Sequence, residues 1–121
     1  MKNTITAIMV AGGAILGDIV TGIIKGLYLD GLNSTILRKG LFHKLSEMLA
    51  IGFAYGLEYA VKVIDLGIDI PIFYGVITYI VIMELISIIE NICLVNPRLA
   101  KAFAPYLNKF KNLNDGGDND E

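Results

Sequence analysis

The sequence predicts an all-α membrane protein with about three transmembrane helices, cytoplasmic amphipathic helices and assembly into an oligomer. Its 121 residues amount to one domain. Hydrophobic residues make up 55 % of the chain and the mean hydropathy is +0.62, which exceeds the usual values for soluble domains. Three stretches are nearly free of charge, whereas Arg and Lys gather in two places, which is typical of a small polytopic membrane protein.

The first span is predicted at residues 5–24. Its length of about 20 residues is enough to cross a hydrocarbon core of about 30 Å. We expect it to be retained rather than cleaved as a signal, because no A-x-A site follows and the apolar character continues past Asp18. A loop is predicted next, around Gly26, Asp30, Gly31 and Asn33.

A basic amphipathic helix is predicted at residues 34–47. One face carries Leu37, Leu41, Leu45 and Met48, and the other carries Arg38, Lys39, His43 and Glu47. Such a helix is suited to lie at the lipid headgroups before the chain turns into a second span at residues 49–66.

The third span is predicted at residues 72–95, after a link in which Pro71 prevents helix continuity. A second amphipathic helix is expected at 97–112, with Pro97 in its first turn and Pro105 bending it. The acidic segment 113–121 is predicted to be disordered.

Basic residues predict the orientation. Four lie in the first polar segment and four in the C-terminal segment (Lys25, Arg38, Lys39, Lys44; Arg98, Lys101, Lys109, Lys111), and the link between the second and third spans has none. Both basic segments should therefore be cytoplasmic, with the N-terminus outside. We expect Arg38, Lys39, Lys101, Lys109 and Lys111 to contact anionic headgroups.

Polar residues inside the predicted spans form the candidate pore or oligomer seam. Glu84, Ser87, Glu90 and Asn91 fall within about a third of the circumference of one helix. Their stripe should face protein or water, either as a purely structural seam or as a surface wetted during function. Glu58 and Lys62 have the spacing of a helical ion pair, and Asp18 is expected to pair with Lys62 or with a neighbouring chain.

Small residues at four-residue spacing predict close helix packing. The pairs are Gly13 and Gly17, Gly22 and Gly26, and Gly52 and Gly56. Because three helices can hardly shield all the polar groups, these ridges favour a homo-oligomer.

No catalytic, cofactor-binding or metal-binding residue is predicted. The sequence lacks a nucleophile–base pair, a phosphate loop and a metal-ligand spacing, which argues against an enzyme. The net charge of −2 gives no indication of nucleic-acid binding. Cys93 is expected to be a packed thiol and His43 a solvated side chain.

Three segments resemble bacteriophage holins of the toxin secretion/phage lysis type: "DIVTGIIKG" (18–26), "LNSTILRKGLFHKL" (32–45) and "ELISIIENICL" (84–94). The matching positions are Asp18, Gly22, Lys25, Ser34, Arg38, Lys39, Gly40, Glu84, Ser87, Glu90 and Asn91. The resemblance covers most of the chain and implies a single holin-like domain at residues 1–112.

The resemblance also implies a function. Holins accumulate in the bacterial cytoplasmic membrane, form oligomers and open lesions that release an endolysin or, in related loci, a large toxin. Two alternatives remain open at the level of sequence. One is a small ion channel or transporter subunit, and the other is a membrane anchor that recruits a cytoplasmic partner through residues 97–121.

Overall fold

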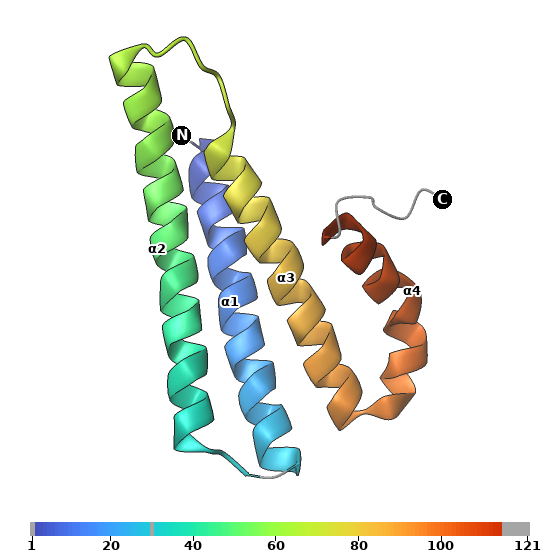
Figure 1. Ribbon diagram of the computed structural model, residues 1–121. Coiled ribbons are helices and arrows are strands. Elements are labelled where there is room, and N and C mark those ends of the chain that lie inside the picture. Colours follow the sequence, from blue (N-terminus) through green and yellow to red (C-terminus); the bar gives the residue numbers. More distant parts are fainter. Residues whose placement is uncertain (1, 30, 115–121) are drawn as a thin grey trace.

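The computed structural model of the protein describes residues 2–29 and 31–114, and all regular structure in these ranges is helical. The helices are α1 (Lys2–Leu29), α2 (Ser34–Ile64), α3 (Ile72–Val95) and α4 (Pro97–Asn114). α1 and α3 run in the same direction, α2 runs antiparallel to both, and α4 turns back beside α3 (Figure 1). The predicted all-helical class is confirmed.

Two helices are long and apolar enough to cross a membrane: Asn3–Leu29 within α1, and all of α3. They contain the first and third predicted spans. α1 continues through Gly26 to Leu29, so the loop before α2 is shorter than expected, and Asp30 lies outside the described residues. The second predicted span is not among these apolar helices, because charged residues interrupt α2.

α2 is one continuous helix where the sequence predicted two elements. Asn33 caps its start by accepting hydrogen bonds from the backbone N–H groups of Thr35 (2.9 Å) and Ile36 (3.3 Å). Asp65 ends it in the left-handed conformation (φ 59°). No proline separates the expected amphipathic helix 34–47 from the expected span 49–66, so the helix runs through both, and residues 65 and 66 lie beyond its end.

Contacts between α2 and α3 define their axial register. The Tyr55 and Phe73 rings meet edge to face with centroids 5.5 Å apart, and Lys44 forms an ion pair with Glu84. Lys44 lies 11 residues before Tyr55, and Phe73 lies 11 residues before Glu84. The part of α2 that lies beside α3 is therefore about residues 33–56.

Only some of the predicted glycine ridges face other residues. A Cβ at Gly17 would lie 3.0 Å from the Ile88 side chain, so α1 and α3 approach closely there. A Cβ at Gly22 would meet Asn91, and one at Gly26 would meet Leu32 of the adjoining loop. At Gly13, Gly52 and Gly56 a Cβ would meet nothing within 4 Å.

α4 packs beside α3 and contains Pro105 in its interior. Its ribbon changes direction along its length (Figure 1). Lys111 reaches back to Glu90 of α3, with 3.3 Å between Nζ and Oε2. The helix continues to Asn114, two residues into the predicted disordered tail, and residues 115–121 lie outside the described part of the chain.

Candidate functional site

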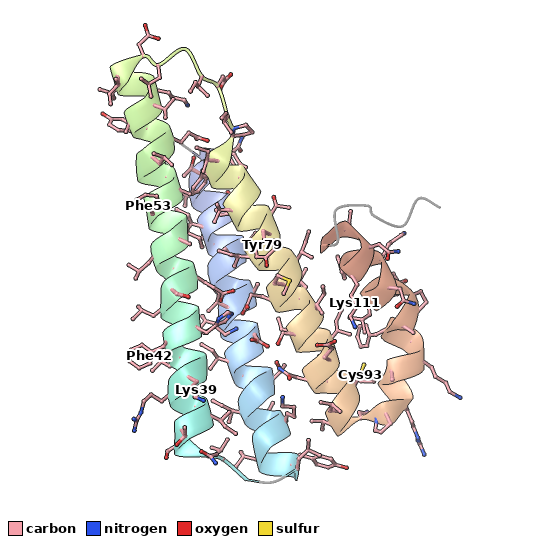
Figure 2. All side chains as sticks on the ribbon, viewed as in Figure 1. Lys39, Phe42, Phe53, Tyr79, Cys93 and Lys111 are labelled. Carbon is pink, nitrogen blue, oxygen red and sulfur yellow. The ribbon has the colours of Figure 1, made fainter. Side chains whose placement is uncertain are left out.

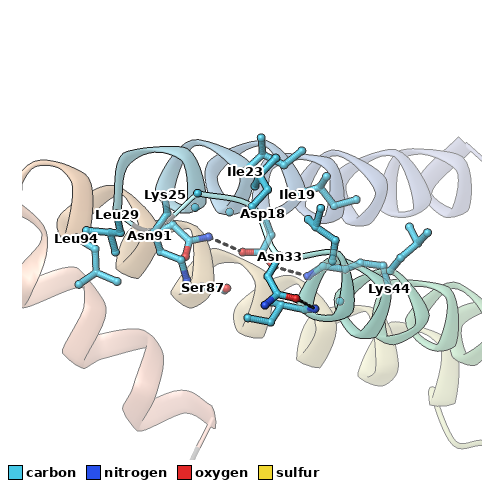
Figure 3. A pocket seen from close by; sticks show the side chains of 18 residues that line it. Asp18, Ile19, Ile23, Lys25, Leu29, Asn33, Lys44, Ser87, Asn91 and Leu94 are labelled. Carbon is cyan, nitrogen blue, oxygen red and sulfur yellow. Dashed lines mark hydrogen bonds and ion pairs between the residues drawn. The ribbon is translucent and has the colours of Figure 1, made fainter.

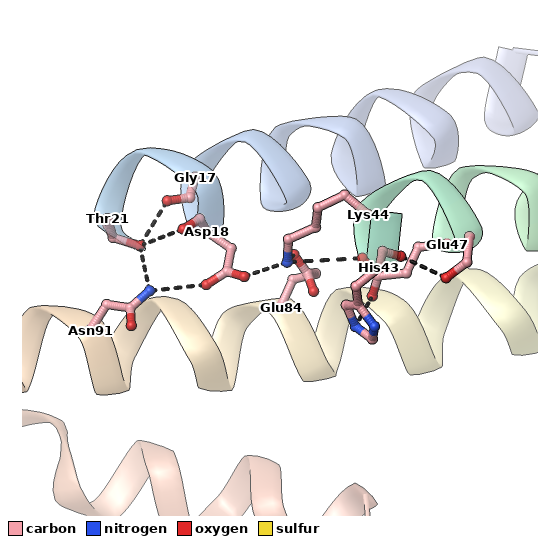
Figure 4. A network of polar contacts seen from close by, with 9 residues as sticks. Gly17, Asp18, Thr21, His43, Lys44, Glu47, Glu84 and Asn91 are labelled. Carbon is pink, nitrogen blue, oxygen red and sulfur yellow. Dashed lines mark hydrogen bonds and ion pairs between the residues drawn. The ribbon is translucent and has the colours of Figure 1, made fainter. Parts of the chain in front are cut away.

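A cluster of charged side chains joins the three long helices at mid-length. Lys44 of α2 donates hydrogen bonds to the carboxylates of Asp18 in α1 and Glu84 in α3 (Figure 4). Lys44 is only 7 % exposed and Glu84 only 2 %. A buried charge is costly unless it is paired and hydrogen-bonded, so this arrangement connects all three helices through one ammonium group.

Asn91 extends the cluster along the α1–α3 interface. Its Nδ2 donates to Asp18 Oδ1 and to Thr21 Oγ1, both at 3.0 Å. Thr21 in turn donates its hydroxyl to the backbone carbonyl of Gly17 at 2.8 Å. We call Asp18, Thr21, Lys44, Glu84 and Asn91 the ionic seam.

Glu47 adds a third carboxylate beside Lys44. Its side chain is only 11 % exposed, and its Oε1 lies 3.9 Å from Lys44 Nζ. That oxygen is buried and has no hydrogen-bond partner among the described residues. Three acidic groups therefore share one buried lysine, and Glu47 Oε2 also lies 3.8 Å from His43 Nε2.

Potential metal donors also meet here. The donor atoms of His43, Glu47 and Glu84 lie within 4.8 Å of one another. Sequence spacing could not indicate this group, because Glu84 comes from a different helix. Lys44 already supplies a positive charge to Glu84 and Glu47, so we describe the group as part of the ionic environment and assign no metal to it.

Lys44 is the principal residue that sequence reasoning missed as a site residue. From the sequence alone, Lys44 is counted only among the basic residues of the first polar segment. A signal was present, since Lys44, Glu47, Ile51, Ala54 and Glu58 recur at intervals of three and four residues. All five are buried or partly buried in the structure.

The predicted stripe on α3 is divided between two neighbours. Glu84 and Asn91 face the seam, and Ser87 lines a groove beside it. Glu90 instead is half exposed and pairs with Lys111 of α4. α4 takes one edge of the stripe because it folds back on α3.

The predicted ion pair between Glu58 and Lys62 is wrong, and so is the Lys62 alternative for Asp18. The other alternative for Asp18, a neighbouring chain, stays a prediction. Glu58 accepts a hydrogen bond from the backbone N–H of Phe73 at 3.3 Å, rather than pairing with Lys62. Lys62 is exposed and forms no ion pair with the described residues. Asp18 pairs with Lys44 and not with Lys62, which lies 18 residues further along α2.

Several large apolar side chains of α2 are exposed. Leu41, Phe42 and Leu45 are exposed, and Phe53 is 73 % exposed (Figure 2). The expected headgroup-facing polar side therefore partly faces inward, through Lys44 and Glu47, while Arg38 and Lys39 remain exposed near the start of the helix. Polar groups inside and large apolar groups outside are typical of a helix surrounded by lipid.

No curated protein and no solved structure matches the chain significantly. A sequence model of the family described as "Bacteriophage holin family" matches residues 2–112, which is nearly the whole chain and includes every residue of the ionic seam. The chain that holds this seam between three helices therefore belongs to the bacteriophage holin family.

Proposed function

We propose that the protein is a holin that accumulates in the bacterial cytoplasmic membrane, forms a homo-oligomer and opens lesions. An endolysin or a large toxin would leave the cytoplasm through them. The observation that carries the proposal is the Asp18–Lys44–Glu84 cluster, which lies between helices whose outward-facing side chains include many large apolar ones. The chain that contains it belongs to this family. No catalytic role is proposed for any residue.

In this proposal α1, α2 and α3 cross the bilayer side by side. The register of α2 against α3 favours a crossing at about residues 33–56, in place of the predicted 49–66. An isolated Lys or Asp at the centre of a membrane helix costs about 2.5–3.5 kcal/mol, and mutual pairing of Lys44, Asp18 and Glu84 offsets much of this cost. The N-terminus would be outside and α4 cytoplasmic.

The ionic seam would change its surroundings when the oligomer opens. In the single chain its charges are closed off by the three helices. If the helices separate during assembly, the same charges need water, since lipid cannot solvate them. The seam residues, together with Ser87, would then line the lesion, and the open glycines Gly13, Gly52 and Gly56 offer close-packing surfaces for other copies.

The proposal is tested by inducing the gene in a bacterium with and without a co-expressed endolysin. We expect an abrupt loss of membrane potential in both cultures, leakage of a large dye, and lysis only with endolysin. Passage of small ions without the dye would support a channel instead. Complete loss of function on removal of residues 97–121, with no leakage at all, would support an anchor.

Variants of the ionic seam test whether its charged residues line the lesion. Asp18→Leu/Lys44→Leu/Glu84→Leu removes the buried charges, so the protein should insert at least as well as the parent but leak far less dye. The control Glu90→Leu/Lys111→Leu removes an exposed ion pair and should leave leakage intact. Parent-level leakage from the triple variant would show that the seam does not line the lesion.

A further inference from the structure

We propose that a groove between α1 and α2 binds an anionic phospholipid of the cytoplasmic leaflet, with the acyl chains inside and the phosphate near Lys25. The inference rests on the membrane crossing of α1, α2 and α3 proposed above. The groove has a volume of about 900 Å³ and is lined by the C-terminal half of α1, the N-terminal part of α2 and the end of α3 (Figure 3).

The groove exists because α1 and α2 pack against α3 rather than against each other. Three glycines line its walls: Gly22, Gly26 and Gly40. A Cβ at Gly40 would meet nothing within 4 Å. The remaining wall is mostly aliphatic, including Ile23 and Leu41.

The length of the groove matches one leaflet. It extends from Asp18 to Leu29, a rise of about 16 Å along α1, which is about half of a hydrocarbon core of roughly 30 Å. The Asp18–Lys44 ion pair lies at the inner end, at the level of the bilayer centre in the proposed crossing. The outer end reaches the loop at Gly31, Leu32 and Asn33.

Charge at the outer end selects an anionic headgroup. Lys25 lines the groove and forms no ion pair with any described residue. Arg38 and Lys39 are exposed in the first turns of α2, at the same end of the bundle. A basic group at an anionic leaflet strengthens attachment, so loss of Lys25 should weaken binding about fivefold.

The test uses the purified full-length protein in phosphatidylcholine vesicles that contain phosphatidylglycerol with a photoreactive acyl chain. We expect adducts on the groove segments 19–29 and 36–41, and weaker labelling when the photoreactive lipid is phosphatidylcholine. Gly40→Leu fills the groove and Lys25→Gln removes the charge, so each should lower adduct yield about fivefold or more. Gly56→Leu, on the same helix but outside the groove, and Lys62→Gln, at an exposed position outside the groove, are the matched controls.

The outcomes separate this inference from the proposed function. Equal adduct yields for Gly40→Leu and Gly56→Leu, or adducts spread over all lipid-facing surfaces, would contradict specific lipid binding in the groove. A Gly40→Leu variant that loses chain-to-chain cross-links while keeping lipid adducts would assign the groove to a second copy and also overturn it. Dye leakage is measured separately: a parent that labels in the groove but never leaks dye would contradict only the holin proposal.

Discussion

Lys44 determines the electrostatics of the interior because, among the residues whose burial the structure describes, it is the one buried cation, and three acidic groups surround it. It pairs with Asp18 and Glu84, and Glu47 Oε1 lies 3.9 Å from its Nζ, within ion-pair range but beyond hydrogen-bond distance. Replacing a buried ion pair by apolar groups can be neutral, but removing one partner leaves an uncompensated charge. The contribution of Lys44 is therefore best measured together with its partners.

Lys44→Met should lower the free energy of unfolding by about 3–5 kcal/mol, because Asp18 and Glu84 are left unpaired. The triple variant Asp18→Asn/Lys44→Met/Glu84→Gln should regain most of this loss. Thermal unfolding followed by circular dichroism in detergent micelles measures both effects. Lys101→Met, at an exposed position, is the control. A Lys44→Met protein as stable as the parent would contradict a structural role for the pairing.

At the scale of the elements, the close approach of α1 and α3 depends on Gly17. Its missing side chain admits the Ile88 side chain, and Asn91 bonds to Asp18 and Thr21 one turn away. Gly13 lies one turn earlier on α1 and has open space around it. The two glycines therefore differ in role although they belong to one sequence ridge.

Gly17→Leu should force α1 and α3 apart and destabilise the bundle by about 1–3 kcal/mol. Gly13→Leu should be neutral or slightly stabilising, because leucine is a better helix former than glycine and has room at this position. The midpoint of thermal unfolding in the same detergent measures the difference. Equal midpoints for the two variants would show that α1 and α3 do not pack through Gly17.

At the scale of the whole molecule, the position of α2 relative to the bilayer distinguishes two topologies of the same fold. With the predicted span 49–66, Tyr59 would lie in hydrocarbon. With the register of the structure, the membrane segment is about 33–56 and Tyr59 lies beyond its outer end. Both topologies keep the link at residues 67–71 outside.

Cysteine labelling separates the two topologies in a Cys93→Ser background. A membrane-impermeant reagent added to intact cells should label Asp69→Cys and Tyr59→Cys, because both are exposed and lie outside the proposed membrane segment. Leu32→Cys, which is exposed and precedes the proposed membrane segment, should react only after the cytoplasmic side is opened. Labelling of Leu32→Cys in intact cells would contradict the proposed orientation, and protection of Tyr59→Cys would support the span at 49–66.

The all-helical class, the two apolar spans and the starts of α2, α3 and α4 could be predicted from the sequence, whereas the continuity of α2 could not. These features depend on local chemistry: apolar runs form α1 and α3, Asn33 caps α2, and Pro71 and Pro97 mark helix starts. It also indicated that Glu84 and Asn91 need a polar environment, because hydrocarbon cannot solvate them.

Which polar groups meet depends on the tertiary structure. Lys44 pairs with both Asp18 and Glu84, which lie 26 and 40 residues away from it in the sequence. Such pairings depend on the rotation and axial register of separate helices. A slip of one helical turn moves each side chain by about 5.4 Å relative to the neighbouring helix, which is enough to change its partner. Helical periodicity places a residue on a face, but it does not say which neighbouring helix covers that face: α1 and α2 enclose Glu84, and α4 takes Glu90.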